Sequence, residues 1–234
     1  IDYTTGEGVV LLEPQSTNSL LQSNQFDTAW VNTNSTETSG QIGVGGSTDA
    51  WLLEKSGANG RVTQSISLSG VQSFSVYAKA GSLNWLKIQA YNGSLFNSSH
   101  FDLANGTIGT DTNLIDSSIT NVGGGWYRCS IYFNCVNQLV YIYPADADND
   151  TTGTSGNIYI QYAQLEALPY ATSYIPTSGA IATRLADSVT GAGDATTFNS
   201  TEGVLYVEMA AIGDTGVFEV VSLSDGGLSD IVAF

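Results

Sequence analysis

The stretch Trp85-Leu-Lys-Ile-Gln-Ala-Tyr91 decides the fold, because its side chains alternate in polarity with a period of two. Every second residue from position 86 is apolar: Leu86, Ile88 and Ala90. The residues between them are aromatic, cationic or amide: Trp85, Lys87, Gln89 and Tyr91. Alternation of this kind is typical of a strand that packs one face on a core. The other face of such a strand is solvated or lines a cleft.

The same alternation recurs along the chain, whereas helical periodicity is hard to find. Further alternating strands are predicted at 61–68, 73–78, 127–135 and 158–163. Another is predicted at 139–143, where nearly every residue is apolar. Turn signals separate them, among them Ser69-Gly70, Asn92-Gly93, Asn105-Gly106 and Gly123-Gly-Gly125. Many short antiparallel strands with this punctuation predict an all-β fold, an antiparallel β-sandwich or jelly roll.

The composition excludes several classes of partner. The 234 residues include 22 Asp and Glu but only 6 Lys and Arg, so the net charge is −16. A nucleic-acid-binding surface needs a basic footprint, and an anionic membrane surface would repel this chain. No segment approaches the roughly 20 apolar residues of a membrane-spanning helix. We read the charge as a source of solubility, with cation binding or a saline habitat as the alternatives.

Cys129 and Cys135 are the only cysteines, and both fall on the predicted strand 127–135. A strand rises about 3.3 Å per residue, which separates them by roughly 20 Å. A disulfide requires Cα atoms within about 7 Å. We therefore expect two reduced thiols that pack as small hydrophobic side chains.

The predicted strands divide the chain into four parts. Residues 1–14 are expected to form a strand that leads into the fold, with Val9-Val-Leu-Leu12 buried. Residues 15–175 form the main domain, and 176–202 form a linker. Strands at 204–211, 216–222 and 228–234 then begin a second β-sandwich or serve assembly. Three strands make a poor independent domain and have unpaired edges, so we expect a homo-oligomer or larger assembly through sheet edges.

The outer face of 85–91 is the candidate sugar-binding surface. An aromatic ring can pack on the C–H face of a sugar, while amide and ammonium groups bond its hydroxyls. The candidate residues are Trp85, Lys87, Gln89, Tyr91 and Trp51, and Phe96 and His100 could join them. The alternative is a strand buried on both faces, or an outward edge. Trp30 and Trp126 are expected in the core.

An acidic loop is the candidate metal site. Asp146, Asp148 and Asp150 lie in Pro-Ala-Asp-Ala-Asp-Asn-Asp-Thr, and Ca²⁺ prefers carboxylate and carbonyl oxygens. The EF-hand pattern fails, because its sixth and twelfth positions would be Thr151 and Asn157. The sequence thus leaves two interpretations, a structural Ca²⁺ site and a solvated acidic loop.

The sequence gives little support to catalysis, and we expect no enzyme. His100 is the only histidine, in Ser98-Ser-His-Phe-Asp102, so no His-rich metal site can be built. The Gly-X-Ser-X-Gly motif of a serine nucleophile is absent. Residues 203–234 also lack the Glu-X-Asp-X-X-Glu pattern of sandwich-fold glucanases.

Three segments carry a resemblance to a known family. They are Leu11-Leu-Glu-Pro-Gln-Ser-Thr-Asn18, Gly125-Trp-Tyr-Arg-Cys-Ser130 and residues 164–187, which begin Gln-Leu-Glu-Ala-Leu-Pro-Tyr. Together they resemble phage and prophage tail or surface proteins. In that family a jelly-roll domain like a carbohydrate-binding module precedes a concanavalin-like, laminin-G-like sandwich. The resemblance also suggests structural calcium near the domain ends, where Glu13, Asp49 and Glu166 are candidates.

The resemblance implies a non-catalytic, lectin-like tail or fibre module that adheres to a host polysaccharide or surface glycan. Its location would be extracellular or on the virion surface. Two other functions stay open. One is a carbohydrate-binding module of a secreted polysaccharide-degrading enzyme, and the other is a purely structural filament subunit.

Overall fold

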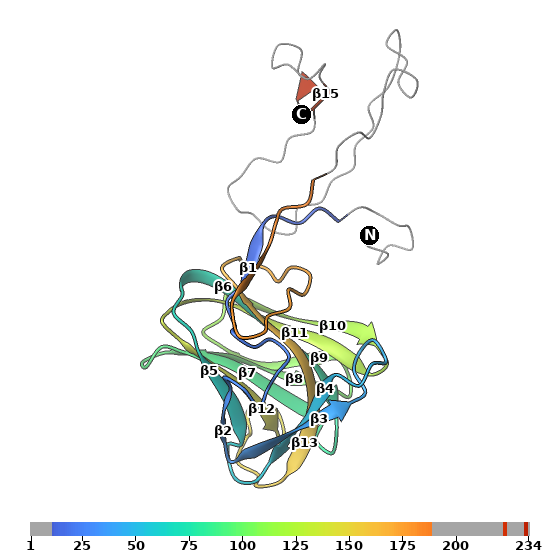
Figure 1. Ribbon diagram of the computed structural model, residues 1–234. Helices are drawn as coiled ribbons and strands as arrows, with labels where there is room; N and C mark the ends of the chain where they lie inside the picture. The colour runs from blue at the N-terminus through green and yellow to red at the C-terminus, as the bar shows by residue number, and fades with distance from the viewer. Residues whose placement is uncertain (1–10, 189–221, 224–231, 234) are drawn as a thin grey trace. The chain divides into compact units, whose positions relative to one another are not determined.

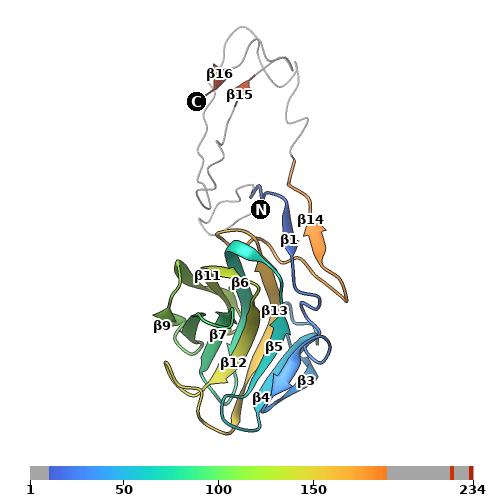
Figure 2. The same ribbon diagram turned by 90° about the vertical axis from the view of Figure 1, so that its left-hand side faces the viewer.

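The computed structural model describes residues 11–188, 222–223 and 232–233. The chain forms two compact units, Ile1–Asp187 and Ser188–Phe234. Two six-stranded antiparallel sheets build the first unit, and Figures 1 and 2 show them lying face to face. This arrangement confirms the predicted β-sandwich.

The first sheet has the strand order β10-β11-β6-β13-β4-β3. Its strands are β3 (Ser35–Gln41), β4 (Ala50–Lys55), β6 (Ser69–Ala80), β10 (Asp116–Gly123), β11 (Trp126–Val136) and β13 (Gly156–Glu166). The second sheet has the order β2-β5-β12-β7-β8-β9. Its strands are β2 (Val31–Thr33), β5 (Arg61–Ser65), β7 (Trp85–Tyr91), β8 (Phe96–Asp102), β9 (Thr107–Thr112) and β12 (Leu139–Ala145). From β4 to β7, and again from β11 to β13, successive strands alternate between the sheets, as in a jelly roll.

The core lies between the sheets and is built by the alternation seen in the sequence. The inward residues of β7 are Leu86, Ile88 and Ala90, and none is exposed to solvent. The first sheet supplies Phe74, Val76, Ile131 and Phe133, also fully buried. Full burial of one such large apolar side chain stabilises the fold by roughly 1.5–3 kcal/mol. Trp30 and Trp126 are buried as expected.

The two cysteines confirm the strand assignment of 126–136. Both side chains are buried and both thiols are free. Burial raises the pKa of the Cys129 thiol well above its usual value, so this thiol stays protonated at neutral pH.

The polar strand β8 was not predicted. Its residues Asn97, Ser98, Ser99 and His100 are polar but buried, since β8 pairs with β7 along its whole length. A tight turn joins the two strands, in which the Asn92 side-chain oxygen accepts hydrogen bonds from the amides of Ser94 and Leu95. Gly93 has φ +92°, a conformation that favours glycine. The turn sets the register that places Phe96 opposite Tyr91.

The domain ends close on each other, which changes the predicted boundaries. β1 (Ser16–Asn18) pairs with β14 (Ala182–Arg184), and the Arg184 guanidinium forms an ion pair with the buried Glu13 carboxylate. Residues 176–187 therefore belong to the first unit, although the sequence placed them in a linker. Leu12 was expected to be buried but is 55% exposed, because Glu13 takes the inward position beside it. Residues 1–10 lie outside the described residues.

Glu166 is the buried carboxylate of the 164–187 segment. It accepts hydrogen bonds from the Ser16 hydroxyl at 2.6 Å, from the Thr172 amide at 2.9 Å and from the Thr172 hydroxyl. These bonds satisfy the charge with hydroxyl and amide donors. They also fasten the turn after β13 to the first strand of the domain.

In the second unit, β15 (Ser222–Leu223) pairs with β16 (Val232–Ala233) in antiparallel orientation. The rest of the strands predicted at 204–211, 216–222 and 228–234 lie outside the described residues. In the described ranges, no helix has the length and apolar character needed to cross a membrane.

Candidate ligand-binding site

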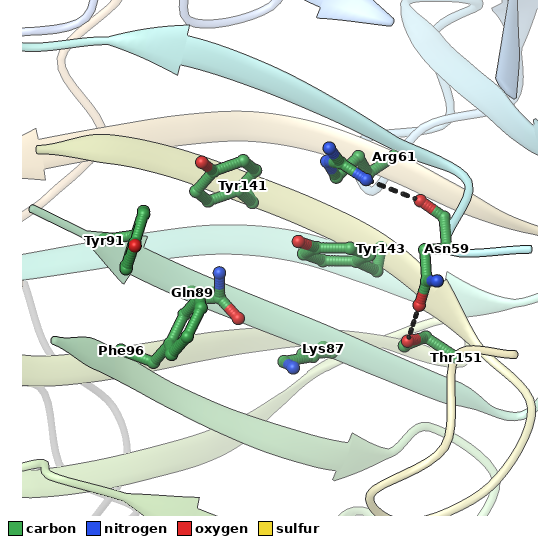
Figure 3. A pocket seen from close by; sticks show the side chains of 9 residues that line it. All are labelled: Asn59, Arg61, Lys87, Gln89, Tyr91, Phe96, Tyr141, Tyr143 and Thr151. Carbon is green, nitrogen blue, oxygen red and sulfur yellow. Dashed lines mark hydrogen bonds between the residues drawn. The ribbon is translucent and has the colours of Figure 1, made fainter. Parts of the chain in front are cut away.

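A hollow of about 300 Å³ lies on the outer face of the second sheet (Figure 3). Its lining combines aromatic, cationic and amide side chains: Asn59, Arg61, Lys87, Gln89, Tyr91, Phe96, Tyr141, Tyr143 and Thr151. These residues come from β5, β7, β8, β12 and two loops. Three of the five predicted sugar-binding residues, Lys87, Gln89 and Tyr91, are among them.

Strand pairing brings the lining residues together. In the register of β12 and β7, Tyr141 lies opposite Gln89 and Tyr143 lies opposite Lys87. The intervening residue Ile142 points into the core and is fully buried. Side chains at alternate positions on paired strands share one face, so the tyrosines meet the polar face of β7.

The aromatic rings form two neighbouring pairs. Tyr91 and Phe96 stack with centroids 4.3 Å apart and planes inclined by 16°, and Phe96 is 49% exposed. The Tyr91 hydroxyl donates a hydrogen bond to the Gly93 carbonyl at 2.7 Å, which fixes its ring. Tyr141 and Tyr143 lie 5.9 Å apart and are mostly buried. Phe96 is therefore the ring that is most open to a ligand.

Two cations lie over the tyrosine rings. The Arg61 guanidinium carbon is 5.6 Å from the Tyr141 centroid and 5.7 Å from that of Tyr143. The Lys87 ammonium is 5.4 Å from the Tyr143 centroid. Burial lowers the pKa of Lys87 and raises the pKa of Tyr143 to about 12. Both shifts arise because removal from water disfavours the charged form of each group.

A chain of hydrogen bonds holds the Arg61 end of the hollow. The Thr151 hydroxyl donates to the Asn59 side-chain oxygen at 2.8 Å, and Arg61 donates to the Asn59 carbonyl at 3.1 Å (Figure 3). Beneath this loop the Lys55 ammonium donates to Asp146 at 2.5 Å and to the Thr151 carbonyl at 3.1 Å. The loop thus connects a buried ion pair to the wall of the hollow.

Neither of the two predicted tryptophans, Trp85 and Trp51, lines the hollow. Trp85 is on the same face of β7, but its ring lies against Gly109, where an added Cβ would come within 2.7 Å of it. Trp51 is not part of this surface: it is on β4 of the first sheet, only 5% exposed, and belongs to the core. Its indole N–H donates to the Asn24 carbonyl at 2.8 Å, and its ring meets Phe26 edge to face.

The three aspartates of the acidic loop each have a separate partner. Asp146 pairs with Lys55, Asp148 accepts from the Thr110 amide and hydroxyl, and Asp150 accepts from Thr152. Within the described part of the chain, no group of three His, Cys, Asp or Glu side chains could hold a metal ion. The separate partners of these aspartates argue against a calcium ion at the loop, and a titration with Ca²⁺ tests the expectation drawn from the sequence.

The Ser-His-Asp residues of β8 are not arranged as a triad. The His100 ring nitrogen Nδ1 lies 3.3 Å from the Thr110 carbonyl, and the Ser99 hydroxyl donates to the His100 carbonyl. The Asp102 carboxylate accepts from the amides of Ala104 and Asn105. Burial lowers the pKa of His100, and the ring lies on the outer face opposite Lys87.

A second aromatic cluster lies on the first sheet. The rings of Tyr162 and Tyr174 stack at 4.3 Å beside a hollow of about 400 Å³. Their hydroxyls are already bonded, to Asp49 at 2.8 Å and to Ser23 at 2.6 Å. Tyr162 has φ +52° at a bulge of β13. Because the rings stack on each other and their hydroxyls are occupied, we assign this cluster a structural role.

Sequence reasoning missed Arg61, Tyr141, Tyr143, Asn59 and Thr151. Residues 139–143 read as a nearly continuous apolar run, although Tyr141 and Tyr143 in fact share the outer face. The signal lay in the alternation of tyrosine with Val140 and Ile142, which are fully buried. Tyrosine can lie on a partly solvated face because its ring is apolar and its hydroxyl is polar, whereas an aliphatic side chain is more stable when buried.

No protein-family model and no curated protein matches the chain. Among solved structures, a carbohydrate-binding module of family 61, in complex with β-1,4-galactotriose, matches 63% of this chain and 97% of its own. The identity is 11% and the TM-score 0.39. The CBM22-1 and GH10 modules of Clostridium thermocellum endo-1,4-β-D-xylanase 10B, complexed with xylohexaose, match at 14% identity and a TM-score of 0.41. The match covers 69% of this chain and 30% of the xylanase chain.

Proposed function

We propose that the protein is a non-catalytic glycan-binding module and that the hollow on its second sheet holds the sugar. The observation that supports this proposal is the convergence of four aromatic rings with cationic and amide donors in one hollow. Its volume of about 300 Å³ lies at the lower end of the range for small-ligand sites.

The lining residues offer two kinds of contact to a sugar, apolar rings and hydrogen-bond donors. Phe96, backed by Tyr91, offers an exposed apolar ring to the C–H face of a sugar. Arg61, Lys87 and Gln89 offer N–H donors to its hydroxyl oxygens. Contacts of this number give weak binding at one site. Assembly of several copies would raise the effective affinity by ~10²–10⁴ without new contacts.

The proposed setting is the surface of a phage or prophage-encoded particle, where the module adheres to a host polysaccharide. The support is the resemblance carried by Leu11–Asn18, Gly125–Ser130 and residues 164–187. The same hollow would serve a carbohydrate-binding module of a secreted enzyme. The full reading frame and its neighbouring genes distinguish the two settings. A catalytic domain in the same reading frame would indicate a secreted enzyme, whereas neighbouring tail genes would indicate a phage particle.

A glycan array probed with the labelled full chain tests the binding proposal. We expect at least one polysaccharide class to be bound, and Phe96→Ala to weaken that binding by about 5- to 150-fold, as for a truncated aromatic anchor worth ~1–3 kcal/mol. Val136→Ala is the matched control, because Val136 is 53% exposed but lies on the first sheet. Absence of binding to every glycan, or equal effects of the two variants, would reject the site.

A further inference from the structure

The few cations of this acidic chain are unevenly placed. All six Lys and Arg residues lie within 11–188, and two of them, Arg61 and Lys87, line the same hollow. The two ion pairs found in the described residues join other cations to carboxylates, Lys55 to Asp146 and Arg184 to Glu13. Among the described residues that line the hollow there is no Asp or Glu, although the chain has 22.

The charges of Arg61 and Lys87 are held in place but not neutralised. Both cations lie within 6 Å of the Tyr143 ring centre, so both border the same ring. Cation–π contacts orient a charged group without cancelling its charge. Within residues 11–188 the Lys87 ammonium has no carboxylate partner, and Arg61 Nε is buried without a hydrogen bond. Arg61 and Lys87 are half-buried, so each has lost part of its hydration without gaining a counter-ion. A ligand that supplies an anion would offset this loss.

The carboxylates closest in sequence to the wall of the hollow have other partners. Asp146 is bound by Lys55, Asp148 by Thr110 and Asp150 by Thr152. The only charged side chains that the described residues bring to the hollow are thus two cations, within a protein of net charge −16. At physiological ionic strength the Debye length is about 8 Å, so the remote acidic surface is largely screened there while the two local cations are not.

We propose that the hollow binds an acidic polysaccharide and that Arg61 and Lys87 together bind its anionic group. This inference rests on the glycan-binding function proposed above and names its ligand class. The planar guanidinium can bond two oxygens of a carboxylate or a sulfate, and the ammonium adds a point charge beside it. Gln89 and the rings of Phe96 and Tyr91 contact the rest of the sugar. The anionic group would be either the carboxylate of a uronate or a sulfate ester, both of which present oxygen atoms with a negative charge.

The test is a glycan array of neutral, uronate-containing and sulfated polysaccharides, probed with the full chain at about 0.15 M salt so that long-range repulsion is screened. The strongest ligand is then measured by calorimetry before and after carboxyl reduction or desulfation. We expect an acidic glycan to bind best and its neutralised form to bind at least about 10-fold more weakly, since a hydrogen bond to a charged group is worth more than a neutral one. The treatment that abolishes binding identifies the anion.

Variants assign the effect to the two cations. Lys87→Gln and Arg61→Gln should each weaken the acidic glycan by about 10- to 100-fold. Arg61→Lys keeps the charge and should lose less. Lys79→Gln is the matched control, because Lys79 carries the same charge on the first sheet, away from the hollow. Thermal unfolding of each variant verifies the fold, and the chemically neutralised glycan gives the same test without any substitution.

The outcomes separate this inference from the proposal on which it rests. A neutral glycan as the strongest ligand, unaffected by Lys87→Gln and Arg61→Gln, would overturn acidic recognition and leave glycan binding intact. No binding on any part of the array would reject glycan binding and acidic recognition together. An acidic glycan that loses equal affinity with Lys79→Gln would show non-specific charge attraction and also overturn the inference.

Discussion

Replacement of Asp146 by Asn should destabilise the first unit more than the loss of either other carboxylate in the loop 146–153. The Lys55 side chain is completely buried and that of Asp146 is 22% exposed. The ammonium has two oxygen partners, Asp146 at 2.5 Å and the Thr151 carbonyl at 3.1 Å. Asn keeps the shape of Asp but removes the charge, so Lys55 is left as a buried cation without a counter-ion.

The magnitude follows from that burial. Removal of one partner from a buried ion pair costs about 3–5 kcal/mol, and the amide oxygen of Asn recovers part of this, which leaves about 3 kcal/mol. For a domain of this size one kcal/mol shifts Tm by ~2–4 °C. Asp146→Asn should therefore lower Tm by about 6–12 °C, measured by calorimetry or by circular dichroism.

Two comparisons make the measurement decisive. Asp150→Asn, in the same loop, removes an exposed carboxylate that accepts only from Thr152, and should leave Tm unchanged within error. Lys55→Met with Asp146→Asn removes both charges, and the double variant should be more stable than Asp146→Asn alone. If Asp146→Asn were as stable as Asp150→Asn, the reasoning from a buried ion pair would be refuted.

Three further predictions concern the boundary, the buried tyrosine and the acidic loop. A chain that stops after Asp187 should fold with the stability of the full first unit. A chain that stops after Gly179 should unfold at a lower urea concentration, because it loses β14 and the ion pair of Arg184 with Glu13. Burial raises the pKa of Tyr143 to about 12, so the unfolded chain ionises first, near pH 10. The stability that the neutral Tyr143 phenol gives is present below pH 10 and is lost as pH rises through about 12, by ~2 kcal/mol. In urea titrations Tyr143→Phe should remove this part of the loss, whereas Tyr162, whose pKa burial also raises to about 12, keeps its own part. Millimolar Ca²⁺ should not raise Tm, because the three loop aspartates have separate partners; a rise that Asp148→Asn abolishes would contradict this.

The sequence predicted the elements whose pattern is local. β7 was predicted with the bounds 85–91 and with the correct inward face, because strict alternation needs no knowledge of the partner strand. β8 was missed because its centre, Asn97 to His100, is polar. The strand lies inside the sheet, between β7 and β9, and no local pattern reveals that position.

The candidate site was predicted in part for the same reason. The outer face of β7 follows from alternation, but its neighbours depend on the register between distant strands. Tyr143 meets Lys87 although 56 positions separate them in the sequence. Trp51 was predicted to bind sugar because of its residue type alone. Its indole instead packs beside Phe26 in the core. The residue types of one strand indicate which ligand its face could bind, but the binding site itself is formed by several strands whose pairing the sequence does not show.

The loop 146–153 connects the stability of the sandwich with the charge of the hollow. Lys55 binds both Asp146 and the Thr151 carbonyl, and the Thr151 hydroxyl binds Asn59, whose carbonyl accepts from Arg61. The ion pair thus neutralises the carboxylate that would otherwise lie free in this loop, and it supports the residues that hold Arg61. Asp146→Asn should consequently weaken glycan binding as well as stability. Asp150→Asn, which breaks no contact in this chain of bonds, should alter neither, and a loss of binding in Asp150→Asn would place the functional link elsewhere in the loop.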